Sequence, residues 1–318
     1  MKRVVAVAVV GCVIACGGLV RPVRWEVEGL SMAPGLMPGD VVASGVFPSL
    51  ARRRPGRFER WTLAAPDGPT AVKRVWGLPG EVVGIVAGDV VVDGTVLLKP
   101  PRVLAEMALP VAAVPQAAAR GTRAFILPEP VFDDAPFAPH ERRLLTPVRD
   151  VGLAAVIDVA ASPAPDREEV VELRVADRTA RARLPRPSRH VVVAGRLDGA
   201  FVAAAWSPEP GPEPRSCLPP GAGALWSVHV PWDRDAAVTA CEVRIVSPAG
   251  SEPRAVIERA VVWRDVHHLP PADGTRQWRL GPDEHLVLGD YPGGSRDSRQ
   301  WGPVGRDRFR DRLSTVRR

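Results

Sequence analysis

Two segments of the chain offer residues that could carry out nucleophilic catalysis. Ser31 lies in Gly29-Leu-Ser-Met-Ala-Pro-Gly-Leu-Met-Pro-Gly-Asp40, and Lys73 lies in Val72-Lys-Arg-Val-Trp-Gly-Leu-Pro-Gly-Glu81. A serine hydroxyl needs a base to remove its proton, and no histidine of this chain lies in a Gly-x-Ser-x-Gly or similar setting. A lysine can be that base where burial lowers its pKa enough to leave a neutral amine. The two segments therefore predict a Ser-Lys dyad.

A third segment could orient this pair. Leu288-Gly-Asp-Tyr-Pro-Gly-Gly-Ser-Arg-Asp-Ser-Arg-Gln-Trp-Gly302 is a polar loop that follows an apolar stretch. Its first serine, Ser295, offers a hydroxyl that can bond to a neutral amine without favouring the charged form, as a carboxylate would. Gly289-Asp290 is expected to form the turn that returns the loop towards the dyad.

The scarcity of lysine makes Lys73 informative. Of the 42 basic residues only Lys2, Lys73 and Lys99 are lysine. Arginine cannot give up its proton in a protein, whereas a desolvated lysine can. A position that needs a neutral amine would therefore resist replacement by arginine, and the neighbours Val75 and Trp76 could supply the burial.

Taken in order and with their local spacing, the three segments resemble those of the bacterial type I signal peptidases, or leader peptidases. These are membrane-anchored serine proteases that remove signal peptides from exported proteins by means of a Ser-Lys dyad. The resemblance covers roughly residues 1–100 and 280–305. It implies that Ser31 is the nucleophile, that Lys73 is the general base and that Ser295 orients the lysine amine.

Further roles follow from the same resemblance. Asp297 and Arg299 are expected to form a supporting ion pair. The backbone N–H of Ser31 is expected to stabilise the oxyanion, and Gly29 stands where some relatives add a hydroxyl to that site. Leu30 and Met32 are candidates for an apolar collar that contacts the substrate or the membrane.

The segments depart from the usual pattern of the family in two places. Gly35 stands where threonine is usual, and Tyr291-Pro292 replaces the usual Asn-Arg after Gly-Asp. Because Pro292 has no N–H, the loop around Ser295 is expected to differ in geometry. None of the expected catalytic groups is missing.

The N-terminus is expected to be a targeting element. Met1-Lys-Arg3 precedes an uncharged run from Val4 to Val20, close to the shortest length for a membrane-spanning helix. We expect residues 1–22 to form a retained anchor in the cytoplasmic (inner) membrane, crossing once, with the catalytic domain on the outer face. A lipoprotein signal ending at Cys12 or Cys16, or a cleaved signal peptide, are the alternatives.

An exported chain would place Cys217 and Cys241 in an oxidising compartment, where they could form a disulfide; two unpaired buried thiols are the alternative. The histidines and cysteines show no metal-ligand spacing, so neither a metal nor another cofactor is expected. The net charge of +6 is spread over the chain without a nucleic-acid-binding signature, and a basic surface beside an anionic membrane explains it more simply. The expected partners are preprotein signal peptides and the lipid bilayer, with the protein as a monomer.

The fold is expected to be mainly antiparallel β. A catalytic domain of residues 23–100 and 281–318 would be interrupted by a β-rich insert of residues 101–280. In the first part, strands over residues 82–86, 89–92 and 95–98 are expected to form a meander with Asp93-Gly94 as a hairpin turn. Valine-rich alternation over residues 169–184, 190–206 and 224–246 predicts a sandwich in the insert.

Two other functions compete with general signal-peptide cleavage. The chain could be a Ser-Lys protease dedicated to a few partners that its insert selects. It could also be an inactive, membrane-tethered binding protein that uses the insert, although the presence of Ser31, Lys73 and Ser295 counts against that interpretation.

Overall fold

The computed structural model describes residues 23–44, 54–111, 116–119, 121–138, 143–160, 169–185, 188–209, 217–219, 221, 223–233, 237–246, 254–274 and 277–317. The predicted anchor over residues 1–22, with Cys12 and Cys16, lies outside the described residues. Within the described ranges, no helix combines the length and the apolar character needed to cross a membrane.

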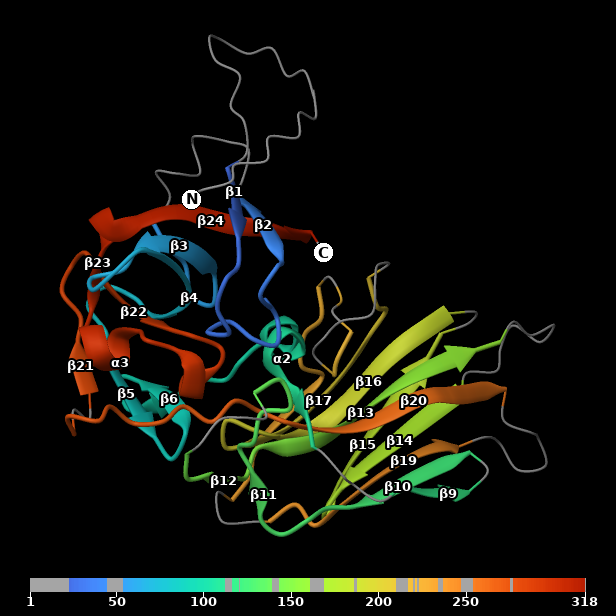
Figure 1. Cartoon of the computed structure of the whole chain (residues 1–318). Coiled ribbons are helices and arrows are strands. Elements are labelled where there is room, and N and C mark those ends of the chain that lie inside the picture. The colour runs from blue at the N-terminus through green and yellow to red at the C-terminus, as the bar shows by residue number, and fades with distance from the viewer. Residues whose placement is uncertain are drawn as a thin grey trace, which may run out of the picture.

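The protein is mainly β and its strands pair antiparallel, as the sequence predicts. Figure 1 shows two groups of strands, one containing both the first and last strands of the described chain, the other built from the middle of the sequence. The short helix α2 (Pro101–Met107) lies between the two groups.

The first group contains a seven-stranded sheet that draws on both ends of the chain. In spatial order its strands are β1 (Arg24–Glu26), β2 (Val41–Ser44), β24 (Phe309–Arg317), β3 (Arg60–Ala64), β4 (Thr70–Gly77), β22 (Glu284–Leu288) and β23 (Val304–Gly305). Strand β4 carries Lys73, and β22 pairs with it and leads into the third motif. The sheet therefore brings the second and third motifs together. Strand β1 lies at the sheet edge and leads towards Ser31.

The predicted meander is confirmed as part of a four-stranded sheet. Its order is β21 (Gln277–Arg279), β5 (Val82–Val86), β6 (Asp89–Val92) and β7 (Thr95–Val96). Asp93 and Gly94 between β6 and β7 have φ of 48° and 81°. A tight hairpin turn with two positive φ values favours an Asp-Gly pair, since glycine adopts this conformation without a steric penalty.

The second group is a sandwich of two sheets. The six-stranded sheet runs β18 (Val228–Pro231), β17 (Ala200–Trp206), β16 (Ser188–Leu197), β13 (Val151–Val159), β20 (Ala255–Arg264) and β8 (Leu109–Pro110). The five-stranded sheet runs β15 (Arg178–Leu184), β14 (Glu169–Val175), β19 (Ala240–Val246), β10 (Thr122–Ile126) and β9 (Gln116–Ala119). The short pair β11 (Val131–Phe132) and β12 (Pro147–Val148) lies beside them.

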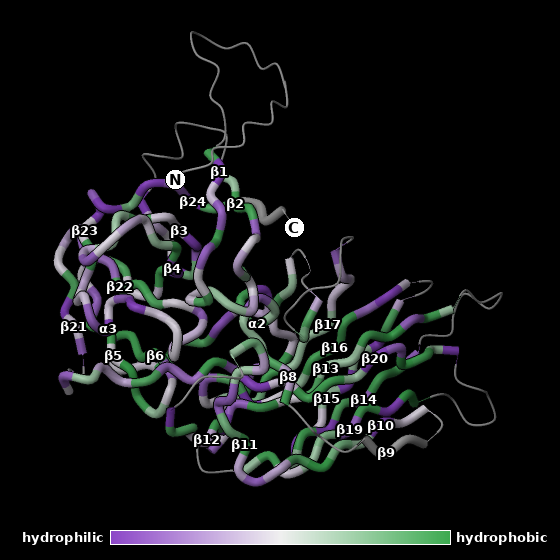
Figure 2. The backbone as a smooth tube through the Cα atoms, in the orientation of Figure 1, coloured by the Kyte–Doolittle hydropathy of each residue, from purple (hydrophilic) through white to green (hydrophobic). Residues whose placement is uncertain are grey.

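Alternation along β13 explains how the six-stranded sheet is covered on both faces. Leu153 and Ile157 pack into the cluster between the two sheets, while Ala154 packs on the opposite face with Trp263. Successive side chains of a strand point to opposite faces, so one strand serves two cores. Figure 2 shows hydrophobic residues gathered along the strands of this sandwich.

The helical elements are short: α2, the helix α3 (Ser298–Trp301), and the 3-10 turns η1 (Pro292–Gly294) and η2 (Arg306–Arg308). Helix α2 joins the two groups of strands. Leu104 packs on the outer face of the sandwich, and Val103 and Met107 pack with Trp76 beside the meander.

The predicted disulfide between Cys217 and Cys241 is wrong for this fold. Both thiols are free and buried. Cys241 lies in the cluster between the two sheets of the sandwich, and Cys217 lies in the cluster on the far face of the six-stranded sheet. A whole sheet therefore separates them, and the alternative of two buried thiols applies.

The predicted domain limits stay a prediction. The sandwich is made from residues 109–264, inside the expected insert of residues 101–280. However, β21 precedes residue 281 and pairs with β5 of the meander, and α2 contacts both groups of strands.

Candidate active site

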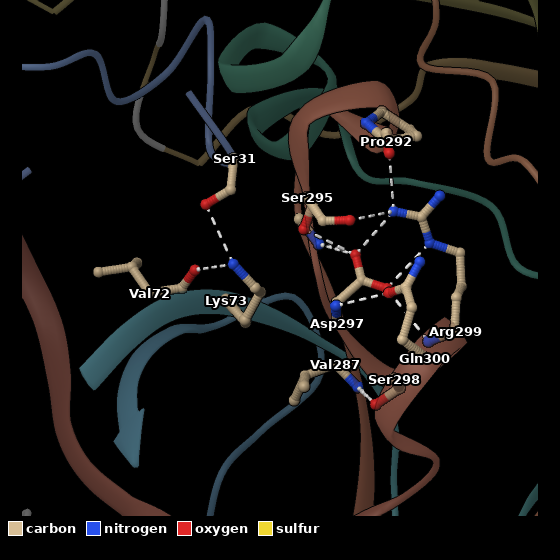
Figure 3. A network of polar contacts seen from close by, with 11 residues as sticks. Ser31, Val72, Lys73, Val287, Pro292, Ser295, Asp297, Ser298, Arg299 and Gln300 are labelled. Atoms are coloured by element: carbon tan, nitrogen blue, oxygen red, sulfur yellow. Dashed lines mark hydrogen bonds and ion pairs between the residues drawn. The ribbon is translucent and has the colours of Figure 1, made fainter. Parts of the chain in front are cut away.

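The structure brings Ser31 and Lys73 into direct contact (Figure 3). Lys73 Nζ donates a hydrogen bond to Ser31 Oγ at 3.0 Å and a second to the carbonyl of Val72 at 3.0 Å. Ser31 lies at the start of a turn that follows β1 and is partly exposed, whereas Lys73 is only 3% exposed. A hydroxyl open to solvent beside a buried amine has the arrangement that nucleophilic attack on a bound peptide requires.

Burial also sets the protonation of Lys73. Desolvation lowers its pKa to about 8, while the charges of Asp297 and Asp290 act in the opposite direction. A cation loses hydration when it is buried, which favours the neutral amine. Trp301 adds to the enclosure, since the centre of its ring lies 5.9 Å from Nζ. An appreciable fraction of Lys73 is therefore neutral near neutral pH.

A buried ion pair that the sequence analysis missed joins the second motif to the third. Arg74 donates to both carboxylate oxygens of Asp290, from Nε at 2.8 Å and from Nη2 at 2.6 Å, and both side chains are fully buried. Nη2 also lies 2.9 Å from Glu106 of α2. Burial alone would lower the pKa of Arg74, but the carboxylates of Asp290 and Glu106 raise it above its usual value. Their charges therefore keep Arg74 ionised.

The orientation of Arg74 follows from the strand that holds it. Lys73 and Arg74 are neighbours on β4, so their side chains leave opposite faces of the sheet. One turns to Ser31, and the other anchors the Gly-Asp turn of the third motif. The opposite charges of Arg74 and Asp290, each within a short motif, are the available signal for this pair, but they do not specify that these two residues meet.

Asp297 organises the loop of the third motif. Its Oδ2 accepts hydrogen bonds from the Gly289 N–H at 2.9 Å, from Ser295 Oγ at 2.8 Å and from Arg299 Nη2 at 2.9 Å. Its Oδ1 pairs with Arg299 Nε at 2.9 Å, which forms the expected ion pair. Asp297 also caps α3 in a capping box with Gln300. A carboxylate with this many donors is held in one geometry.

Ser295 is placed differently from the expectation. Its hydroxyl donates to Asp297, whereas the Lys73 amine donates to Ser31 and to the carbonyl of Val72. Ser295 nevertheless lies close to Ser31, across Gly289. A Cβ built on Gly289 would stand 2.2 Å from Ser295 Oγ and 2.5 Å from the Ser31 carbonyl. Only glycine allows this approach, so Gly289 holds the two serines on either side of one backbone position.

The turn that carries Ser31 is attached to the same loop. The N–H of Tyr291 donates to the Ser31 carbonyl at 3.1 Å. Gly29 has open space where a side chain would project, so a larger residue could be accommodated there. Leu30 is partly buried and packs near Tyr291.

The expected membrane or substrate contact by Met32 is wrong. Its side chain is 1% exposed and packs with Leu36, Val42 and Leu313. The turn points Met32 inward, where strands from both ends of the chain enclose it. Met32 therefore anchors the turn that carries Ser31 in this core.

Residues 1–116 match the family model described as signal peptidase, peptidase S26. This part of the chain is similar to the signal peptidases of that family. The match agrees with the resemblance inferred from the sequence, and it supports a hydrolase, namely a protease of signal-peptidase type. The match spans Ser31 and Lys73, while the third motif lies beyond it and packs against the matched part through Asp290. No curated protein matches the chain.

Proposed function

We propose that the chain is a serine endopeptidase that removes signal peptides from exported preproteins with a Ser31–Lys73 dyad. The observation that carries the proposal is the 3.0 Å contact between Lys73 Nζ and Ser31 Oγ, together with the burial that lowers the lysine pKa to about 8. The family match supports the type of reaction.

The chemistry would proceed in two steps. Neutral Lys73 takes the proton of the Ser31 hydroxyl as Oγ attacks the carbonyl carbon of the scissile bond. Collapse of the tetrahedral intermediate breaks the C–N bond, and the lysine ammonium gives its proton to the leaving amine. The remaining acyl group is an ester on Ser31. Lys73 then deprotonates a water that attacks this ester, which releases the new carboxylate and restores the hydroxyl.

Other groups would position the reacting atoms. The Ser31 N–H is the expected donor to the oxyanion. The Tyr291 N–H fixes the orientation of the Ser31 peptide unit by binding its carbonyl. Asp297 and Arg299 hold the loop, while the Arg74–Asp290 pair fixes that loop to the strand of Lys73.

The substrate would bind as an extended chain. Strand β1 lies at the edge of the seven-stranded sheet and leads towards Ser31, so a peptide can add to this edge by backbone hydrogen bonds. Side chains would then alternate in direction, in keeping with the small residues at positions one and three before the scissile bond that the family requires. The residues before the scissile bond are accordingly assigned to the β1 edge.

A membrane-bound preprotein would reach such a site if the protein is anchored by residues 1–22 on the outer face of the cytoplasmic membrane. This placement is part of the proposal. An added protease tests it. The region that follows residue 22 should be digested when the outer face of the cytoplasmic membrane is accessible to the protease, and it should be protected when that face is not accessible.

The function is tested by incubating the detergent-solubilised full chain with a labelled preprotein that carries an Ala-x-Ala site. Cleavage at the signal junction by the wild type and none by Ser31→Ala is expected. Ser188→Ala, which removes a hydroxyl on β16 of the sandwich, is the matched control and should cleave normally. Cleavage that persists in Ser31→Ala, or a folded wild type that cleaves nothing, would refute the proposal.

A further inference from the structure

The middle of the chain reaches the catalytic loops. Ala135, Phe137 and Ala138 follow β11 and pack in one cluster with Leu30 and Tyr291. The ring centres of Phe137 and Tyr291 lie 4.9 Å apart in an edge-to-face arrangement. Leu30 directly precedes the nucleophile, and Tyr291 binds the Ser31 carbonyl. The sandwich group therefore supplies side chains to the immediate surroundings of Ser31.

The segment that carries Phe137 is held firmly in place. Asp133 Oδ2 accepts from Arg143 at 2.6 Å, and Asp133 Oδ1 accepts from the Thr146 N–H at 2.6 Å. These contacts tie the start of the segment to the residues that precede β12. Arg264 of β20, 2% exposed, donates to the carbonyl of Asp134 and thereby fixes the segment to the six-stranded sheet. A side chain that contacts a substrate specifically must be held in a fixed position, and these contacts hold the segment of Phe137 in that way.

Both departures from the usual motifs of the family lie against segments that follow residue 100. Tyr291, in place of asparagine, packs on Phe137. Gly35, in place of threonine, lies under α2, where a Cβ would stand 3.0 Å from the Glu106 carbonyl. The altered residues thus accommodate the segments that follow residue 100. The two departures in the catalytic loops are therefore explained by contacts with the expected insert.

The cluster presents a partly exposed apolar surface beside the nucleophile. Leu30, Met37, Phe137 and Ala138 are only partly buried, whereas Ala135 and Tyr291 beneath them are buried. Figure 1 shows β1 at the opposite end of the first strand group from β11 and β12. A peptide that lies along β1 up to Ser31 would therefore continue past this surface on the other side of the scissile bond.

We propose that Phe137 forms a subsite that contacts the substrate residue immediately after the scissile bond and favours an apolar side chain there. This inference rests on the proposed protease function and assigns part of its specificity to the insert. Phe137 acts through contact with the substrate, and Tyr291 positions it. Burying an apolar side chain against an aromatic ring favours that substrate by about 10-fold or more over one with glycine.

The test compares two preprotein substrates that differ only in the first residue after the cleaved bond, leucine or glycine. The kcat/KM of each is measured with the full chain and with Phe137→Ala. We expect the leucine-to-glycine ratio to fall about 10-fold in Phe137→Ala and to be restored in Phe137→Leu. Phe132→Ala is the matched control, because Phe132 is an exposed phenylalanine on β11 outside the cluster, and its ratio should be unchanged.

Each other outcome overturns a distinct claim. An equal loss for both substrates would mean that Phe137 only supports the fold of the loop, and an unchanged ratio would mean that the substrate does not touch it. If Phe137→Ala does not fold, the wild type still tests the proposal, because a leucine-to-glycine ratio near 1 in the wild type would overturn the subsite. Failure of the wild type to cleave either substrate would instead refute the protease function.

Discussion

The pH dependence of cleavage follows directly from the burial of Lys73. Desolvation lowers the pKa of this amine to about 8, even though Asp297 and Asp290 oppose the shift. Only the neutral amine can accept the Ser31 proton, so the rate should follow the neutral fraction of Lys73. Raising the pH from 6 to 9 is therefore the perturbation that tests the dyad with the least change to the protein.

The size of the effect can be worked out from the shift. A pKa of about 8 leaves about 10% of the amine neutral at pH 7, whereas the ordinary value of 10.5 would leave only about 0.03%. Burial thus makes about 300 times more of the active form available. The rate should rise about 10-fold between pH 6 and pH 7, reach half its maximum near pH 8 and level off above about pH 9.

The assay is kcat/KM for cleavage of a labelled preprotein at constant ionic strength over this pH range. Lys73→Arg, which keeps the charge, should show no cleavage at any pH, because arginine does not deprotonate. A flat profile, a midpoint near the ordinary histidine value of about 6.5, or activity of Lys73→Arg close to wild type would refute the reasoning.

Three further changes have defined outcomes. Gly289→Ala should lower kcat at least about 100-fold in the same cleavage assay while the far-UV circular dichroism is kept, because its Cβ would stand 2.5 Å from the Ser31 carbonyl; activity near wild type would contradict this. Asp89→Asn should raise the melting temperature at pH 8 and have little effect near pH 4. Burial and neighbouring carboxylates raise the pKa of Asp89 to about 8, so the folded state keeps a proton that the unfolded chain releases, and stability from this group is lost as pH rises from about 4 towards 8. A gain that is equal at both pH values would contradict the shift. Met32→Ala should lower the free energy of unfolding in urea by about 2–5 kcal/mol, since it leaves a cavity in a closed core; an unchanged urea midpoint would contradict the burial of Met32.

The chemistry of the site was predictable because it is carried by local motifs. A serine, a lysine and a polar loop keep their residue types and spacing wherever the fold takes them, and the Asp93-Gly94 turn likewise predicts its hairpin from two residues. Contacts between distant segments were not predictable in this way. The Arg74–Asp290 pair joins residues 216 positions apart, and no periodicity relates them.

The direction of side chains in irregular segments was also beyond the sequence. Met32 follows Ser31 in a turn and points inward, into a core that includes Leu313 from near the end of the sequence. Strand β13 was missed because it is covered on both faces, so its residues are almost all buried and show no alternation of apolar and polar types. The same two-sided sheet keeps Cys217 and Cys241 apart.

The most direct test of the dyad is to trap the covalent intermediate. The full chain is mixed with a labelled preprotein, quenched with acid within the first turnover, digested and analysed by mass spectrometry. An acyl group on the peptide that contains Ser31 is expected in the wild type, and none is expected in Ser31→Ala or Lys73→Arg. An acyl group on another residue, or an intermediate that forms at the normal rate in Lys73→Arg, would contradict the assignment of Ser31 and Lys73.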